Sequence, residues 1–488
     1  MAEQMMQDAA GKAIPVGYKQ TEVGVIPEDW EIKTLGELVD IYSGESPSKF
    51  NFTESGIPYF KVEQLNDGLM YADETPYFID TQKTVRAGSV IFPKRGASIL
   101  LNKIRLLKRD SFMDTNLMAL TCSFSLDALY LYNQLIYKKL SSVADTTSIP
   151  QINNKHITPY AIPFPTKQEQ TAIANVLSDS DALIDALEQL IAKKQAIKSA
   201  TMQQLLTGRT RLPAFALRPD GTPKGYKPSE LGDIPDDWEV VSLGDVIQKV
   251  TGGGTPSRAN PTYWGNEIPW VTVKDFATFN PSMAQEYITK TGLANSSSNL
   301  IPRGTLITST RMALGKAVVY DVDVAINQDL KAIFPNSDVV VSYLFYWFEL
   351  NAVKIDDLGS GSTVKGLSLG DLRNLSFLLL SSEEQTAIAT ILSDMDNELQ
   401  ALTQKLDKAR ALKQGMMQQL LTGKIRLPLA VGGIDGGMSA AQPDDRLCRE
   451  PGHRSHPAPD LLDCCVTGAL LIGAIDVYLS EKKEILLL

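Results

Sequence analysis

Side chains able to hydrogen-bond nucleic-acid bases gather beside apolar segments in two parts of the chain. The candidates in SVIFPKRGASILLNKIRLL and in GTLITSTRMALGKAVVYDVDVAINQDLKAIF are Lys94, Arg95, Lys103, Arg311, Lys316 and Gln328. Arg, Lys and Gln contact base edges in the grooves of DNA and also hold phosphates. From Lys83 to Arg109 the chain has eight basic residues and no acidic one. Taken alone, such a basic segment is more often a solvated face, so both interpretations stay open at this point.

Other side chains of the same chemical kind extend the candidate set for contacts with bases or phosphates. They are Lys61, Arg105, Arg258, Lys274 and Thr308. Threonine hydroxyls and basic side chains are common donors to phosphates and base edges.

Several motifs resemble catalytic sites but lack a required part. The run from Asn260 to Trp264 resembles the Asn-Pro-Pro-aromatic motif of adenine methyltransferases, but its third position is Thr262. No glycine-rich strand-to-helix turn accompanies it to hold S-adenosylmethionine. Gly252–Gly254 lacks the Gly-Lys-Ser/Thr of a phosphate loop. Glu31 and Lys33 suggest a nuclease pair, but a second copy of that segment, PDDWEVV, has no lysine. We therefore expect no catalytic residue and no cofactor.

Cysteine and histidine usage gives no clear metal site. Cys448, His453, His456, Cys464 and Cys465 are irregularly spaced, unlike the paired ligands of zinc knuckles. We expect no bound metal there. Only Cys122 precedes this tail, which argues against a disulfide framework and favours a reducing cytoplasm. The late apolar run from Val466 to Leu479 is too short for a membrane span, so no membrane association is expected.

The elements that position the basic residues are short apolar strands punctuated by glycine and proline. This alternation predicts sheet-rich α+β domains. The length of 488 residues predicts two to four domains. Its net charge of −10 does not exclude DNA, because binding depends on local patches and not on the total charge.

The chain is a tandem repeat. PVGYKQTEVGVIPEDWEIKTLGEL, from Pro15, matches PKGYKPSELGDIPDDWEVVSLGDV, from Pro223. EQTAIANVLSDSDALIDALEQL, from Glu169, matches EQTAIATILSDMDNELQALTQKL, from Glu384. Between these matching parts the two halves share only scattered anchors. The entry segments and helices thus predict one function in duplicate, and the unlike middles predict two different ones.

The matching helical segments predict a long pair of helices. Each begins at a capping box, Thr166 to Glu169 and Ser381 to Glu384, and ends at Leu-Thr-Gly, where Gly208 and Gly423 suit the position after a helix end. Apolar residues spaced three and four apart form a seam, which includes Leu177, Ile184, Leu187, Ile191 and Leu205, and Leu392, Leu399, Leu402, Leu406 and Leu420. A seam this long predicts that the two helices pack against each other as a spacer.

Polar residues interrupt this seam. The polar residues at seam positions are Ser180, Lys194, Lys198, Thr201 and Lys413. Polar seam residues weaken a zipper, but they fix its register or contact another protein.

The motifs together resemble the specificity subunit of type I restriction–modification systems. The similarity rests on the GYK…TEVG…IP.DWE entry, on GGGTPSRANPTYWGNEIPWVTVKDF and on EQTAIA…MQQLLTG, in the same order in both copies. It implies two target-recognition domains that read a bipartite, asymmetric double-stranded DNA site, separated by antiparallel helices. It also implies docking of two methyltransferase subunits and of restriction–translocase subunits, with no catalysis by this chain.

The resulting fold class is α+β, with two sheet-containing domains joined by two long antiparallel coiled-coil helices in a pseudo-two-fold repeat. We expect a disordered N-terminus at 1–14, domains at 15–165 and 209–380, helices at 166–208 and 381–423, and an atypical disordered tail at 424–488. Relatives in this family end soon after the second LTGKIRL, so the tail is a departure. Two alternatives remain: a cytosolic coiled-coil adaptor that binds only proteins, and a self-sufficient DNA methyltransferase.

Overall fold

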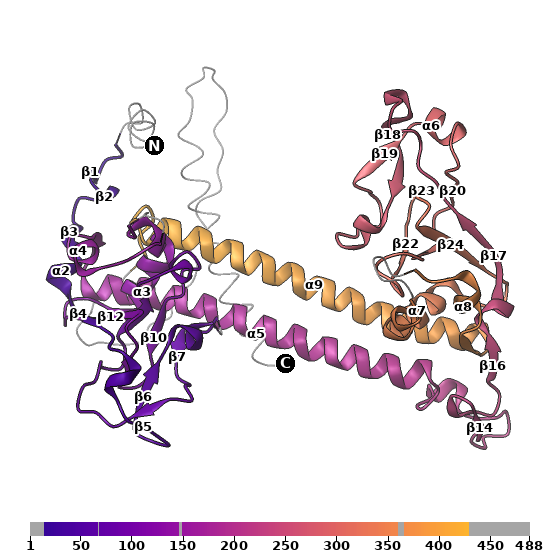
Figure 1. Ribbon diagram of the computed structural model, residues 1–488, viewed down its shortest axis with the longest axis horizontal. Helices are drawn as coiled ribbons and strands as arrows, with labels where there is room; N and C mark the ends of the chain where they lie inside the picture. The colour runs from indigo at the N-terminus through magenta and orange to yellow at the C-terminus, as the bar shows by residue number, and fades with distance from the viewer. Residues whose placement is uncertain (1–13, 67, 146–148, 360–365, 429–488) are drawn as a thin grey trace, which may run out of the picture. The chain divides into compact units, whose positions relative to one another are not determined.

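The computed structural model describes residues 14–428 apart from residue 67, 146–148 and 360–365. Two compact units divide the chain: 1–187 with 406–488, and 188–405. We call them unit 1 and unit 2 (Figure 1). Residues 429–488 of the predicted tail, with its possible zinc ligands, and most of the predicted N-terminal extension lie outside the described residues. Residues 424–428, which were predicted to belong to the disordered tail, are described, and Ile425 and Leu427 pack against the core of unit 1. No helix in the described part of the chain is both long and apolar enough to cross a membrane.

Unit 1 is built on two main sheets. One has the strand order β4-β12-β9-β10-β7 and the other β11-β6-β8-β5, with small pairs β1-β2 and β13-β3 beside them. The strands are β1 (Tyr18–Thr21), β2 (Gly24–Pro27), β3 (Glu31–Thr34), β4 (Val39–Ser43), β5 (Phe52–Thr53), β6 (Ile57–Phe60), β7 (Tyr71–Ala72), β8 (Phe78–Ile79), β9 (Val90–Pro93), β10 (Arg105–Leu107), β11 (Phe112–Met113), β12 (Leu117–Cys122) and β13 (Ala161–Phe164).

Unit 2 also contains two main sheets. Their orders are β17-β24-β21-β22 and β19-β18-β23-β20, and the small pairs are β14-β15 and β16-β25. The strands are β14 (Tyr226–Ser229), β15 (Gly232–Pro235), β16 (Glu239–Ser242), β17 (Ile247–Gly252), β18 (Trp264–Val271), β19 (Glu286–Ile288), β20 (Leu300–Ile301), β21 (Leu306–Ser309), β22 (Ala317–Val319), β23 (Val324–Ile326), β24 (Leu330–Pro335) and β25 (Ser376–Leu379).

The two units share a strand order despite their unlike middle sequences. β4-β12-β9-β10 in unit 1 corresponds to β17-β24-β21-β22 in unit 2, and every neighbouring pair in both is antiparallel. In the second sheet, the parallel pair β11-β6 corresponds to the parallel pair β23-β18. The central strands of the repeat are therefore structurally equivalent, and the sequence difference between the middles lies on a common framework. The edges differ, because β7 has no counterpart in unit 2, and β5 pairs with β8 whereas β20 pairs with β23.

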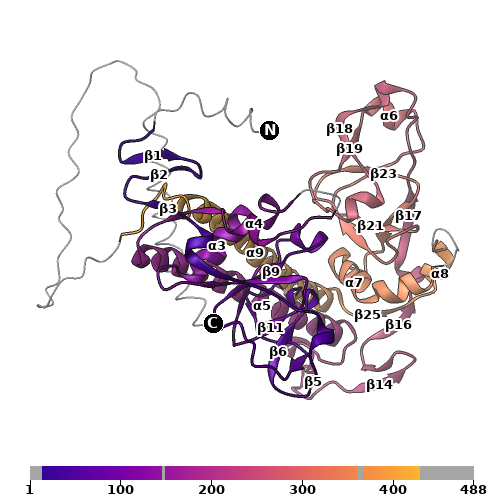
Figure 2. The same cartoon turned by 60° about the vertical axis from the view of Figure 1, so that its left-hand side comes forward.

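Both units also contain helices. The shorter ones are α2 (Leu35–Leu38), α3 (Ala128–Lys138), α4 (Asn154–Ile157), α6 (Lys290–Ala294), α7 (Val341–Asp357) and α8 (Leu369–Arg373). In unit 2, α7 and α8 gather with β16 and β25, whereas α6 lies with β18 and β19 at the other end (Figures 1 and 2). One core of unit 2 packs α7 against the β16-β25 pair, with Trp238, Tyr343 and Phe377 buried in it. A separate cluster holds Trp270 and Ile288 of the β18-β19 pair.

Two long helices run through both units. α5 spans Lys167–Leu206 and α9 spans Ser382–Leu420, so each measures about 60 Å at about 1.5 Å per residue. Within unit 1, Ile173 and Leu177 near the start of α5 share a core with Met417 and Leu421 near the end of α9. Within unit 2, Leu205 near the end of α5 shares a core with Ile388 near the start of α9. The two helices are therefore antiparallel in each unit, as predicted.

The residues of the predicted seam are buried or half-buried, and several of them belong to the cores of the two units. Six of its residues are buried and four are half-buried. The buried ones are Leu177, Leu187, Leu205, Leu392, Leu406 and Leu420, and the half-buried ones are Ile184, Ile191, Leu399 and Leu402. The predicted fold class, two sheet-containing domains on paired long helices, is confirmed.

Candidate nucleic-acid interface and its helical supports

In unit 1 the loop after β9 carries Lys94 and Arg95. Its backbone is tied to a second segment, because the Gly96 N–H donates to the Pro150 carbonyl at 2.9 Å and the Ile152 N–H donates to the Lys94 carbonyl at 2.9 Å. Arg95 forms a backbone bridge with Gln151 and is exposed, while Lys94 is half-buried. The loop is thus a fixed platform that presents a guanidinium to solvent.

Unit 2 has a corresponding loop after β21, which carries Arg311. The Leu367 N–H donates to the Thr310 carbonyl at 3.0 Å, and Arg311 forms a backbone bridge with Gly366. The Arg311 guanidinium is exposed and lies 3.7 Å from the Asp329 carboxylate. Lys316, also exposed, is at the far end of the loop. The position of Arg95 after β9 is therefore reproduced by Arg311 after β21, the strand that occupies the same place in the sheet.

Two lysines near these arginines are held where their charge is poorly solvated. Burial lowers the pKa of Lys94, and the charge of Arg95 lowers it further. Burial likewise lowers the pKa of Lys331, with Asp329 opposing the shift and Arg311 adding to it. An anion placed at either loop would favour the charged lysine, since a nearby opposite charge stabilises the protonated form.

The remaining predicted contacts are spread over both units. Lys61 follows β6, and its ammonium nitrogen lies 3.5 Å from the centre of the Tyr77 ring. Lys103 donates to the Asn66 side chain. Lys274 is exposed in the short helix Val273–Phe276. Gln328 is exposed and accepts a hydrogen bond from the Thr255 hydroxyl at 2.7 Å.

Three predicted contacts have structural partners instead. Arg105 is buried in β10 and donates to the carbonyls of Ile104 and Leu65 at 2.7 and 2.8 Å. Thr308 is buried in β21, where its hydroxyl donates to the Lys316 carbonyl at 2.8 Å.

Arg258 is the third of these side chains. Its guanidinium donates to both carboxylate oxygens of Glu286 at 2.6 and 2.8 Å and lies 3.6 Å from the centre of the Trp264 ring. Arg105 and Thr308 are buried, whereas Arg258 is exposed and is distinguished by its ion pair with Glu286. Position in sequence shows neither burial nor partners.

The motifs that resembled catalytic ones have structural partners as well. The Asn260 side chain accepts from the N–H and hydroxyl of Thr262 at 3.1 and 2.8 Å, at the start of a short helix. Gly254 donates its N–H to the Ile326 carbonyl at 3.0 Å. A methyl group on Gly253 would approach that same carbonyl oxygen to 1.8 Å. These glycines therefore let the end of β17 lie against β23.

A buried carboxylate at the start of each long helix was missed in the sequence analysis. Glu169 of α5 is 1% exposed and accepts a hydrogen bond from the Trp30 indole at 3.1 Å. Arg426, which follows α9, donates to both Glu169 oxygens and to the Asp29 carboxylate at 2.9 and 3.0 Å. We call this set the unit 1 clasp: Asp29, Trp30, Glu169 and Arg426.

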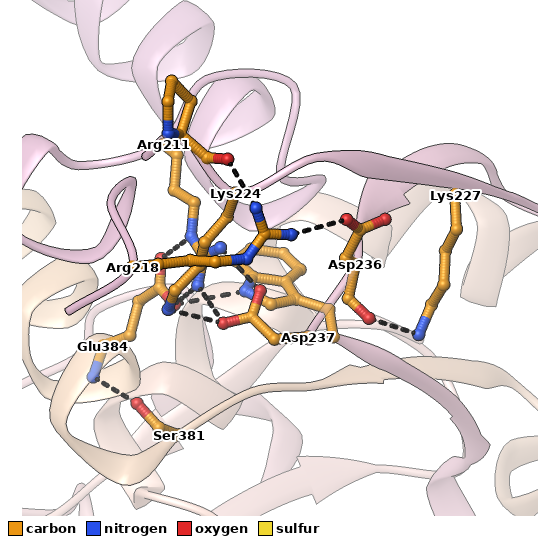
Figure 3. A network of polar contacts seen from close by, with 10 residues as sticks. Arg211, Arg218, Lys224, Lys227, Asp236, Asp237, Ser381 and Glu384 are labelled. Carbon is orange, nitrogen blue, oxygen red and sulfur yellow. Dashed lines mark hydrogen bonds and ion pairs between the residues drawn. The ribbon is translucent and has the colours of Figure 1, made fainter. Parts of the chain in front are cut away.

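The unit 2 clasp has the same chemistry from the equivalent residues: Asp237, Trp238, Glu384 and Arg211. Arg211, which follows α5, donates to the two Glu384 oxygens at 2.9 and 2.8 Å and to the two Asp237 oxygens at 2.5 and 2.7 Å (Figure 3). The Trp238 indole donates to Glu384 at 3.2 Å. In each clasp the arginine after one helix therefore binds the first turn of the other helix.

Charges in the unit 2 clasp stabilise one another. Burial opposes the Arg211 charge, but the hydrogen bonds that Arg211 donates to Glu384 and Asp237 outweigh it and raise its pKa. Burial also opposes the Asp237 charge, and the hydrogen bonds from Arg211 and Lys224 outweigh this and lower its pKa to about 2. Lys224 reaches Asp237 at 2.8 Å. Bidentate arginine–carboxylate pairs of this kind are strong and directional.

Each predicted capping box forms only in part: the hydroxyl caps the helix start, but the glutamate does not. The Thr166 and Ser381 hydroxyls each accept from the N–H three residues later at 3.3 Å, as predicted. The glutamates at those positions do not serve the cap. Their carboxylates are directed to the clasp partners, because both are buried among them.

The glutamine after each clasp glutamate ties the helix start to a shorter helix. Gln170 accepts from the Asp127 N–H at 2.8 Å, just before α3, and donates to the Pro165 carbonyl at 2.9 Å. Gln385 accepts from the Val340 N–H at 2.8 Å, just before α7, and donates to the Leu380 carbonyl at 2.8 Å. The repeated Glu-Gln pair is therefore a joint between the long helix and its domain.

Polar residues between the helices pair across them. Lys198 of α5 donates to Asp396 of α9 at 2.6 Å and to Glu349 of α7 at 2.8 Å in unit 2. Lys413 of α9 donates to Asp181 of α5 in unit 1. Lys198 and Lys413 are equivalent in the repeat, as are Asp396 and Asp181, so the same pair sets the helix register in both units.

The comparisons with known proteins agree with this architecture. The family model described as the type I restriction modification DNA specificity domain matches residues 27–198 and 235–409. The type I restriction enzyme MjaVIII specificity subunit of Methanocaldococcus jannaschii is 26% identical over 423 residues, which cover 82% of this chain and 94% of that protein. The MjaIX specificity subunit of the same organism is 34% identical over 177 residues, covering 35% of this chain and 41% of that protein.

A solved structure shows the same fold. The S subunit of a type I restriction–modification system from M. genitalium aligns with a TM-score of 0.52 at 17% sequence identity, covering 80% of this chain and 96% of that one. The family model matches each copy of the repeat separately. The chain belongs to the family of type I restriction–modification specificity subunits.

Proposed function

We propose that this protein reads a bipartite, asymmetric DNA site and itself catalyses no reaction. Each unit reads one half of the site with the loop after its central strand, β9 or β21. The observation that carries the proposal is the pairing of Arg95 and Arg311 on the same framework with unlike surroundings. A shared framework with different side chains suits two readers of different sequences, because base contacts specify and the scaffold only positions them.

Six members of the predicted set supply the contacts. Arg95 and Arg311 suit bidentate contact with guanine, and Gln328 suits adenine, at about 1–3 kcal/mol of discrimination for each good pair. Lys94, Lys316 and Lys274 suit phosphates, which position the protein without reading sequence. Arg105, Arg258 and Thr308 take no part in this proposal, since their polar atoms serve the fold.

The helices α5 and α9 act as the spacer between the two readers in this proposal. Each helix begins in one unit and ends in the other, and each end is held by a clasp. A helix of about 60 Å is long enough for half-sites about one DNA turn apart, since a turn measures about 34–36 Å. The exposed faces of both helices then remain for two methyltransferase subunits, with restriction–translocase subunits joining the complex.

The protein-only adaptor is the competing function. It requires neither a basic loop in each unit nor a difference between the loops. A gel shift with double-stranded DNA, run with the methyltransferase subunits present, separates the two functions. Sequence-selective retardation supports the reader, and its absence supports the adaptor.

The decisive experiment is the pattern of DNA methylation in cells that carry this chain with its methyltransferase subunits. We expect two short motifs separated by a fixed, unread gap. Replacing residues 45–165 by those of another specificity subunit should change one motif only. A continuous motif, or a change in both, would contradict the proposal.

A further inference from the structure

Large apolar side chains protrude beside the basic residues in the loop of each unit. In unit 1, Leu100 and Leu101 are 61% and 65% exposed, between Arg95 and Lys103. In unit 2, Met312 is 52% exposed and directly follows Arg311. Single exposed apolar side chains are common on protein surfaces, but here they stand beside basic residues in two loops that occupy the same place in the framework.

The unit 1 protrusion is held firmly at its base. Ile99, next to it, is fully buried. Asn102, on the other side, has a positive φ of 50° and is fixed by its side chain, which donates to the Ile136 carbonyl at 3.2 Å and accepts from the Leu140 N–H at 2.8 Å. Leu100 and Leu101 thus stand on a short turn whose two ends are anchored, and little conformational entropy is left to lose on binding.

The protruding residue of unit 2, Met312, is also held by the backbone around it, but through different contacts. Met312 and Ala313 have positive φ values of 53° and 40°, and the next residue, Leu314, is buried. The Ser309 hydroxyl accepts from the Arg311 N–H at 3.2 Å on the other side of the tip. Strained non-glycine residues persist only where their surroundings fix them, and they concentrate at functional sites.

We propose that Leu100 with Leu101, and Met312, are apolar specificity residues that each unit places against the bases of its half-site. The flanking lysine and arginine side chains select DNA as the partner, because their positive charge matches the phosphates on either side of a groove. Leucine and methionine contact thymine methyl groups or enter between base steps, which lysine and arginine cannot do. This inference rests on the proposed function and adds the residues that read apolar features.

The test uses the complex of the full chain with its methyltransferase subunits and a duplex that carries the site found from the methylation pattern. Leu100→Ser with Leu101→Ser, and separately Met312→Asn, remove the apolar contacts; asparagine tolerates the positive φ at position 312. We expect each variant to bind its site about ten- to about a hundred-fold more weakly, as for a mismatched base pair. Binding to a random duplex and the salt dependence should be unchanged, because no phosphate contact is lost.

Matched controls separate this role from general surface effects. Phe124→Ser in unit 1 and Val353→Ser in unit 2 remove apolar residues that are 99% and 75% exposed, and both should leave specific binding unchanged. Leu100→Met with Leu101→Met, and Met312→Leu, should retain most of the affinity.

Three results would overturn the inference while leaving the proposed function standing. One is unchanged specific binding by the serine and asparagine variants. Another is an equal loss on specific and random duplexes. The third is failure of the variants to assemble with the methyltransferase subunits in the absence of DNA. If the unaltered complex shows no specific binding at all, the proposed function itself fails.

Discussion

Arg211 Nη2 lies 2.8 Å from Glu384 Oε2, and the two residues come from different copies of the repeat. The equivalent Arg426 and Glu169 form the same contact in unit 1, at 2.8 Å. Each copy therefore contributes an arginine to the other copy's helix start. The two copies of the repeat do not form separate domains, because each unit includes parts of both copies.

Loss of a clasp arginine should destabilise the protein strongly. Arg211→Ala leaves Glu384 charged and buried, and breaking a buried ion pair in this way costs about 3–5 kcal/mol. Arg211→Lys should lower the free energy of unfolding by less, since lysine keeps the positive charge but cannot form the bidentate hydrogen bonds of the guanidinium. Guanidinium unfolding followed by the fluorescence of the tryptophans measures the effect. The exposed neighbour Arg209 gives the control, and Arg209→Ala should be close to neutral.

The unit 2 clasp should weaken in acid. Arg211 and Lys224 overcome the effect of burial and hold the pKa of Asp237 at about 2 in the folded protein. An unfolded aspartate titrates near about 3.9. The stability from this group is therefore complete above about pH 4 and is lost as the pH falls towards about 2. The free energy of unfolding of the protein and of Asp237→Asn should differ at pH 5 and converge as the pH approaches about 2. Parallel pH curves would contradict this origin.

The ion pair between Lys413 and Asp181 should couple the two helices. Removing either partner leaves the other half-buried among helix side chains. In a double-mutant cycle with Lys413→Met and Asp181→Ala we expect a coupling free energy of about 0.5–3 kcal/mol. The exposed pair Arg410 and Asp407, one turn apart on α9, gives a control cycle with a smaller coupling.

The distance between the two DNA motifs should follow helix length. Deleting residues 188–194 from α5 and 399–405 from α9 removes one heptad from each and keeps the seam in phase. This shortens the pair by about 10 Å, which corresponds to about three base pairs at about 3.4 Å each. The methylation pattern of cells carrying the shortened chain reports the gap. An unchanged gap in an assembled, active complex would reject the spacer role.

Arg95→Ala and Arg311→Ala should each affect one half-site. If the arginine reads a base, specific binding falls by about 1–3 kcal/mol and selectivity is relaxed at one position of that half-site. If it holds a phosphate, binding weakens evenly on all sequences and the salt slope falls by about one. Equilibrium binding at several salt concentrations, to duplexes altered in each half-site separately, decides between these. Loss at both half-sites from one substitution would contradict separate reading.

Periodicity and repetition made most of the architecture predictable. Helix caps, the glycines at Gly208 and Gly423 and the leucine seam are local signals, and each lies in the sequence at fixed spacing. The clasps were not predicted, although Trp30 with Trp238 and Arg211 with Arg426 recur in the repeat. Their contacts join residues far apart in the chain, and repetition alone does not say which groups meet.

The surface residues were harder to predict for the same reason. Arg95 and Arg105 look alike in the sequence, but one is exposed on a loop and the other is buried under carbonyls. The shared strand order of the two middles was also hidden, because framework positions tolerate different apolar residues as long as the pattern of burial is kept.

The first unit to be synthesised is the last to be completed. Its core includes Met416, Met417, Leu420 and Leu421 at the end of α9, and the Gln134 side chain donates to the Leu421 carbonyl at 2.9 Å. During translation the N-terminal unit must wait, with part of its apolar surface uncovered, until almost the whole described chain has left the ribosome. Chaperones that shield nascent chains would thus matter most for the half of the molecule that emerges earliest.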